Sequence, residues 1–133
     1  MKDPITVSIT GAAGNIGTRW PLHATSTGKA IIAFEQQGVS RLGERLDALT
    51  PKTITAREQL QQQLGEIRRR GYAETVDELE EGFSGVAAVV CGENGEVLGA
   101  LSICGPTQRL PAQRRAQFGA ALCKVAAELQ PRS

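Results

Sequence analysis

The fold is decided by residues 86–103, VAAVVCGENGEVLGALSI. Residues 86–91 form a continuous apolar run, and residues 97–103 return with side chains typical of a second strand. Between them, residues 92–95 end in Asn94 and Gly95, a pair that tolerates the positive φ angles of a tight hairpin turn. We therefore predict an antiparallel hairpin that ends where Gly105 and Pro106 interrupt the second strand.

A further strand and a helix are expected before the hairpin. Residues 5–10 alternate apolar and polar side chains, which predicts a strand with one buried face. The glycine-rich stretch 11–19 should be a loop. Thr25 or Ser26 can then cap a helix that runs to Phe34.

Two more helices are expected before the hairpin. The first is a short amphipathic helix, which ends before Pro51 because the residue before a proline avoids the helical region. The second begins at a capping-box pattern, Thr55 with Glu58, and ends at Gly71. The apolar positions of the two helices are Val39, Leu42, Leu46 and Leu49, and then Leu60, Leu64 and Ile67.

The two remaining segments differ sharply in their pattern. Residues 72–81 are acidic and poorly periodic, so we expect no regular element there. Residues 111–129 are predicted to form the last helix, with an apolar stripe of Phe118, Leu122, Val125 and Leu129. Strands paired by a hairpin, with helices grouped elsewhere, indicate an α+β fold in which helices flank an antiparallel sheet.

Composition excludes several classes of protein. A chain of 133 residues suits one domain. Fifteen basic residues against fourteen acidic ones leave a net charge of +1, without the basic excess typical of surfaces that bind nucleic acid. No apolar run is long enough to span a membrane. Three cysteines without metal-site spacing and a single histidine argue against a disulfide framework or a bound metal, so we expect a cytoplasmic protein without a cofactor.

The glycines at 11–17, GAAGNIG, offer an alternative function. They follow a strand, as in the phosphate-binding turn of dinucleotide-binding dehydrogenases, and Glu35 lies about where a ribose-binding carboxylate would be needed. However, that motif requires a helix to start inside it, and Pro21 would break such a helix in its first turns. We keep a dehydrogenase-like fragment as the alternative, and prefer a loop.

Four motifs occur in order along the chain. They are GTRWPLHATSTGKA at 17–30, LTPKTIT at 49–55 with a helix ending in EIRRRGY at 66–72, EEG at 80–82 before VAA at 86–88, and LSICGP at 101–106 followed by Arg109 and Leu110. Together they resemble the C-terminal effector-binding domain of the IclR family of bacterial transcription regulators, and the similarity spans about residues 17–130.

The resemblance implies an architecture and a set of partners. It implies a GAF- or profilin-like effector domain over 17–133 that is incomplete at its N-terminus, with residues 1–16 poorly matched. It also implies a sensor rather than an enzyme, which binds a small effector and assembles into homodimers or homotetramers. DNA would be contacted only through a winged helix-turn-helix, of which this sequence shows no sign. A third possibility is a truncated sensor that only oligomerises.

The resemblance further implies where an effector would bind. Thr25, Ser26 and Thr27 place three hydroxyls at a helix N-terminus, where free N–H groups attract anions. Without the resemblance, an ordinary N-cap with solvated neighbours would be the preferred explanation. Ser102 and Cys104 alternate onto one face of their strand, with Ile103 between them. That face would otherwise be read as either buried or exposed to solvent.

Two more pocket positions distinguish this chain from family members that sense small keto acids. Those members carry an aspartate and a cysteine where Thr75 and Gly85 stand here, and a serine where Cys104 stands. We expect the glycine to enlarge the pocket. The hypothesis is an organic acid other than a small keto acid, aromatic for example, with its carboxylate at Ser26 and Thr27. His23 is expected to orient the loop by hydrogen bonding rather than to catalyse.

Overall fold

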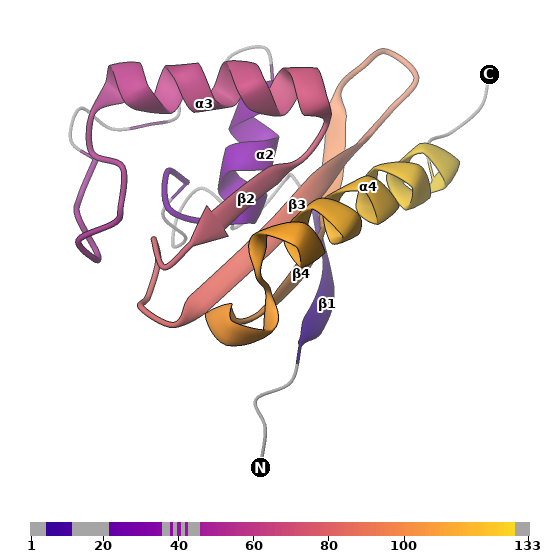
Figure 1. Cartoon of the computed structure of the whole chain (residues 1–133). Coiled ribbons are helices and arrows are strands. Elements are labelled where there is room, and N and C mark those ends of the chain that lie inside the picture. Colours follow the sequence, from indigo (N-terminus) through magenta and orange to yellow (C-terminus); the bar gives the residue numbers. More distant parts are fainter. Residues whose placement is uncertain are drawn as a thin grey trace.

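The computed structural model describes residues 5–11, 22–35, 38, 40, 42 and 46–129. Four antiparallel strands form one sheet in the order β1-β4-β3-β2, and helices cover both of its faces (Figure 1). The predicted α+β fold with an antiparallel sheet and flanking helices is therefore confirmed. The elements are β1 (Thr6–Gly11), α2 (Ser26–Phe34), α3 (Arg57–Arg70), β2 (Ala73–Val76), β3 (Phe83–Cys91), β4 (Val97–Pro106), the 3-10 helix η2 (Thr107–Arg109) and α4 (Ala112–Leu129).

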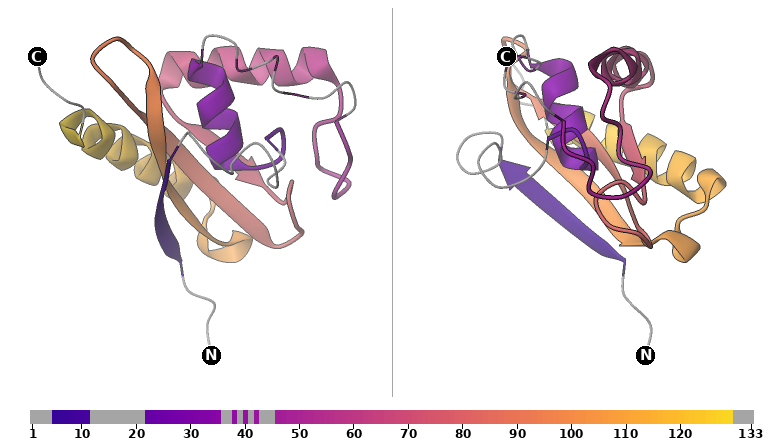
Figure 2. Two further views of the ribbon diagram at one scale, coloured as in Figure 1. Left: turned by 180° about the vertical axis from the view of Figure 1, so that it is seen from behind. Right: turned by 90° about the vertical axis from the view of Figure 1, so that its left-hand side faces the viewer.

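The side chains of the sheet divide between two apolar clusters because neighbouring residues of a strand point to opposite faces. On the face covered by α2, with α3 outside it, small side chains such as Ala87 and Ala100 pack against Ile31, Ile32 and the buried leucines of α3. We call this the α2 face. The opposite face, the α4 face, packs against Leu122 and Ala126 of α4 (Figure 2). The buried side chains of the strands on the α4 face are Val86, Ala88, Leu101 and Ile103.

The hairpin that decides the fold is longer than its sequence predicts. β3 begins at Phe83 and β4 ends at Pro106, so the two strands pair from Phe83↔Pro106 to the turn. Residues 73–76, where no element was expected, form the strand β2. This short strand owes its existence to pairing with β3, a tertiary interaction that a local pattern does not reveal.

Two helix predictions need correction between residues 39 and 58. Residues 39, 41 and 43–45 of the expected helix at 39–49 lie outside the described residues, and Leu46–Ala48 are not helical. At its end, the N–H groups of Leu49 and Thr50 donate to the Thr53 hydroxyl, which satisfies them outside a helix. α3 is capped by Ala56 with no side-chain hydrogen bond, so the capping box of Thr55 and Glu58 is wrong.

The buried face of α4 also differs from the expected stripe. Leu122 is buried and Phe118 is partly buried, but Val125 and Leu129 are 45% and 52% exposed. The line that faces the sheet is Gly119, Leu122 and Ala126. Its small residues let the helix approach closely, and the ring of Tyr72 occupies the space that a side chain at Gly119 would need.

None of the helices among the described residues is long and apolar enough to cross a membrane. β1 pairs with β4 along its whole length, so residues 6–11 belong to the same sheet as the rest of the chain. The division of the chain between residues 16 and 17 stays a prediction.

Candidate functional site

The first turn of α2 lies on the sheet with its polar groups buried. Thr25 is the N-cap, and its hydroxyl accepts a hydrogen bond of 3.0 Å from the Gly28 N–H. This confirms the predicted helix start. Thr25 and Ser26 are 8% and 4% exposed, and Thr27 is half-buried. The expectation that these hydroxyls are merely solvated therefore does not hold for Thr25 and Ser26.

Three of the expected site residues form one row across the sheet. Thr75 in β2 lies opposite Gly85 in β3, and Gly85 lies opposite Cys104 in β4. Ser102, two residues before Cys104, points to the same face and is 4% exposed. The row lies on the α2 face, where Ser102 is buried and Cys104 is half-buried.

At Gly85, the first turn of α2 lies directly against the row. A Cβ atom at Gly85 would lie 2.8 Å from Ser26 Oγ and 3.1 Å from Cys104 Sγ. The first distance is shorter than packed atoms tolerate, so the two side chains already use the space that the glycine leaves. The expectation that Gly85 enlarges the pocket stays a prediction, although Ser26 and Cys104 already take up the space directly at Gly85.

The two remaining features of the strand are the position of Ile103 and the state of the Cys104 thiol. The Ile103 side chain belongs to the cluster on the α4 face, so only its backbone adjoins the row. Burial raises the pKa of Cys104, and the nearby hydroxyls of Ser102 and Ser26 oppose that rise. The thiol is therefore protonated near neutral pH.

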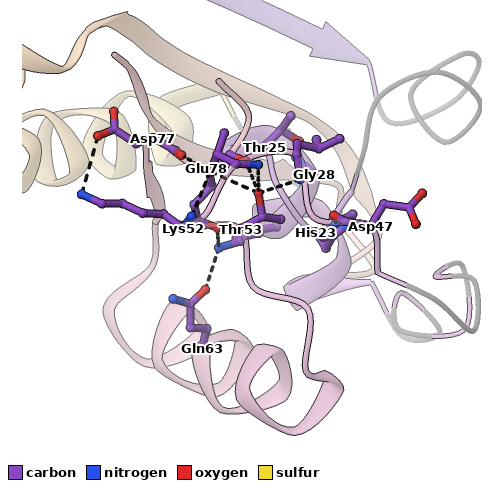
Figure 3. A network of polar contacts seen from close by, with 12 residues as sticks. His23, Thr25, Gly28, Asp47, Lys52, Thr53, Gln63, Asp77 and Glu78 are labelled. Atoms are coloured by element: carbon purple, nitrogen blue, oxygen red, sulfur yellow. Dashed lines mark hydrogen bonds and ion pairs between the residues drawn. The ribbon is translucent and has the colours of Figure 1, made fainter. Parts of the chain in front are cut away.

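One turn after Ser26 in α2, Lys29 forms a buried ion pair that the sequence patterns did not indicate; Figure 3 labels its acceptors Gln63 and Glu78. The Lys29 ammonium is 0% exposed and donates to Glu78 Oε1 at 2.6 Å and to Gln63 Oε1 at 2.7 Å. Burial lowers the pKa of Lys29, although the Glu78 carboxylate favours its charged form. The only indication of such a partner was that Lys29 directly precedes the apolar residues 30–34 of α2.

The segment that carries Glu78 connects β2 to β3 and is held by two threonines. Thr50 Oγ1 donates to the Asp77 carbonyl at 2.5 Å, and Thr53 Oγ1 donates to the Glu78 carbonyl at 2.6 Å. Asp77 has a φ of 58°, a conformation that aspartate tolerates better than most residues. Its carboxylate accepts from the Gly82 N–H at 2.9 Å, which closes the turn.

His23, the metal-ligating residues and the glycine-rich stretch concern the functions that the sequence argued against: catalysis, metal binding and dinucleotide binding. His23 is buried, and its Nε2 donates to the Asp47 carbonyl at 2.8 Å, which matches the expected orienting role. Among the described residues, no group of three or more metal-ligating side chains is close enough to hold an ion. Residues 12–20, with most glycines of the dinucleotide motif, lie outside that part, and the helix α2 starts only at Ser26.

Comparison with known proteins identifies the family. The family model described as the C-terminal part of the bacterial transcriptional regulator IclR matches residues 6–130. The transcriptional repressor IclR of Escherichia coli K12 is 35% identical over 117 residues, which are 86% of this chain and 43% of the relative. KdgR of the same organism is 34% identical over 117 residues, 86% of this chain and 44% of that protein.

Solved structures agree with the sequence matches. The IclR protein of Thermotoga maritima superposes with a TM-score of 0.71 at 32% identity, over 80% of this chain and 44% of that one. The C-terminal domain of Escherichia coli KdgR gives a TM-score of 0.74 at 27% identity, over 96% of this chain and 84% of that one. The chain spans less than half the length of these curated relatives. The family is one of transcriptional regulators rather than enzymes, and the chain belongs to it through the C-terminal effector domain of the IclR type.

Proposed function

We propose that this domain binds a small organic acid between the first turn of α2 and the row of Thr75, Gly85 and Cys104. The observation that carries the proposal is the convergence of buried polar groups from three elements at one place on the α2 face. Among the described residues, no fully buried side-chain nitrogen or oxygen lacks a partner, so what favours a ligand here is the gathering of hydroxyls beside the N–H donors of a helix end.

The charge of the ligand follows from the helix. The first N–H groups of a helix have no partner within it, and the helix dipole favours negative charge there. In α2 the Gly28 N–H donates to Thr25, while the N–H groups of Ser26 and Thr27, as first-turn groups, have no acceptor within the helix. A carboxylate fits this place, with the Ser26 hydroxyl as a further donor.

The rest of the ligand would meet the sheet. Thr75 and Ser102 offer hydroxyls, and Cys104 a thiol, but none of the three offers a carboxylate. Keto-acid sensors of this type are expected to have one at position 75. We therefore favour an organic acid other than a small keto acid. Because Ser26 and Cys104 occupy the space at Gly85, this choice depends on the chemistry of the lining and no longer on a larger cavity.

The domain would pass the state of this site to DNA through a regulator of larger size. We propose that it assembles as a homodimer or homotetramer in the cytoplasm and that DNA is contacted by a winged helix-turn-helix, which the described residues do not form. Curated relatives include proteins named as repressors, which supports a regulatory role in transcription.

Thermal denaturation with candidate acids tests the proposal. A ligand at about 100 times its Kd stabilises the folded state by about 2.7 kcal/mol, which gives a clear rise in Tm. We expect 3-hydroxybenzoate to raise Tm more than pyruvate or glyoxylate does. Ser26→Ala should weaken this rise, while Thr55→Ala, at an exposed position before α3, should not.

The possible outcomes separate the proposals. A rise with pyruvate or glyoxylate and none with an aromatic acid would show that the domain senses keto acids despite Thr75. If no acid in a broad screen changed Tm, the domain would serve assembly alone. An unchanged response of Ser26→Ala would move the site away from α2.

A further inference from the structure

Lys29 lies one turn after Ser26 in α2, but its ammonium reaches away from the helix. It is 0% exposed, and its two acceptors come from distant parts of the chain: Gln63 in α3 and Glu78 in the segment between β2 and β3. Through Glu78 and Gln63, Lys29 therefore connects the turn that carries the candidate site to two elements that pack around it.

The partner segment is itself bound firmly to the sheet. Residues 77–82 connect β2, which carries Thr75, to β3, which carries Gly85. Two strands of the site therefore set the position of this segment. Thr50 and Thr53 hold the carbonyl groups of Asp77 and Glu78 from the other side. Glu78 is thus a fixed point against which the first turn of α2 is held.

A buried ion pair fixes distance in a way that apolar packing does not. Its attraction is strong in a low-dielectric interior and depends steeply on separation and direction. The net stabilisation from the pair is small, because burial of the two charges opposes their attraction. The pKa of Lys29 shows this balance: burial lowers it by more than the Glu78 carboxylate raises it. An apolar pair of similar volume would therefore preserve stability but relax the geometry.

We infer that the Lys29–Glu78 pair sets the spacing between the first turn of α2 and the sheet at Gly85. At that place, Ser26 Oγ and Cys104 Sγ lie so close to Gly85 that even a methyl group would not fit without displacement. Ser26 Oγ and Cys104 Sγ belong to side chains that can rotate, so the width of the gap depends on where the backbone of α2 is held, and the Lys29–Glu78 pair is a charged contact that holds it. Lys29 and Glu78 are thus positioning residues, and their effect on ligand affinity rests on the proposed function.

The thiol of Cys104 reports the gap directly and without any ligand. Its rate of alkylation by iodoacetamide, read by mass spectrometry, rises when the turn of α2 moves off the sheet. We expect Lys29→Met to lower Tm, because it leaves Glu78 buried without its partner, and K29M/E78M to restore most of that Tm. In K29M/E78M, Cys104 should still be alkylated roughly threefold faster or more than in the wild type.

Controls separate this effect from general loosening. Cys123 serves as an internal reference, since it is half-buried and packs on the α4 face, away from α2. Arg115→Met removes a different ion pair, Arg115–Glu74 at 2.7 Å, which joins α4 to β2. It should leave the alkylation rate of Cys104 unchanged.

The decisive result is the behaviour of K29M/E78M. Wild-type alkylation of Cys104 together with a restored Tm would overturn the inference, because the pair would then serve stability alone. If K29M/E78M does not fold, Glu78→Asp replaces it, since it keeps the charge but shortens the side chain. Accelerated labelling of Cys104 in Glu78→Asp supports the inference, and an unchanged rate refutes it. Neither outcome depends on whether an organic acid binds.

Discussion

Replacing Gly28 by alanine should destabilise the domain even though alanine favours helices. Gly28 lies in the first turn of α2, where the chain enters the helix from Leu22. A Cβ at Gly28 would lie 2.7 Å from both the Cα and the carbonyl oxygen of Leu22 and 2.6 Å from Thr25 Oγ1. Backbone atoms cannot rotate away, so the start of α2 must shift and the N-cap bond must lengthen.

The expected magnitude combines two opposing effects. Helix propensity favours alanine over glycine by about 1 kcal/mol. Overpacking in a close-packed interior costs about 1–3 kcal/mol, and here two of the three contacts are to buried backbone, which argues for the upper part of that range. The net effect is a loss of about 1–2 kcal/mol in the free energy of unfolding, or roughly 3–10 °C in Tm for a domain of this size.

The matched control is the same substitution in α3. A Cβ at Gly65 would meet only Arg68 Nη2 at 3.9 Å, so Gly65→Ala should gain about 0.5–1 kcal/mol from helix propensity and from the unfolded state. Urea denaturation followed by circular dichroism measures both variants. A Gly28→Ala protein as stable as the wild type, beside a stabilised Gly65→Ala, would refute the close contact between α2 and Leu22.

Three further predictions concern the cap, the core and the turn. Thr25→Ala removes the N-cap acceptor of the Gly28 N–H and should cost about 0.5–2 kcal/mol in urea denaturation; a loss near zero would contradict the cap. Leu64→Ala, at a side chain 1% exposed, should cost about 2–5 kcal/mol by the same measurement, and a smaller loss would mean that the core there refills. Hydrogen bonds from the Thr107 hydroxyl and the Gly82 N–H hold the pKa of Asp77 below its usual range. The ionised Asp77 carboxylate therefore stabilises the folded domain above the pKa that Asp77 has in the unfolded chain, and this contribution disappears as the pH falls through its pKa in the folded domain. The Tm of Asp77→Asn should therefore lie below that of the wild type near neutral pH and approach it in acid; a constant difference would argue against this linkage.

The residues of the candidate site could be predicted from the sequence, but the way in which α2 packs over them could not. The helix start at Thr25 followed from capping chemistry, and the alternation of Ser102 and Cys104 followed from strand geometry. Thr75 and Gly85 were singled out as pocket positions by the family resemblance, and the strand register places them opposite each other, while their role in binding stays a prediction. The closure of Ser26 over Gly85 could not be read from either source, because it depends on how α2 packs on the sheet.

The sequence by itself determined the elements whose signals are local. The hairpin turn at Asn94 and Gly95, the α3 helix with its buried leucines, and its stop at the positive φ of Gly71 all appear as expected. Each of these is specified by a few neighbouring residues, through turn chemistry or periodicity.

The tertiary structure alone decided the features that join distant residues. β2 forms because β3 offers it a partner, and the small residues Gly119 and Ala126 rather than the larger Val125 face the sheet because α4 packs closely. The ion pair of Lys29 and Glu78 joins residues 49 positions apart. Such burial and pairing depend on which elements contact each other in the tertiary structure, and no local sequence pattern specifies those contacts.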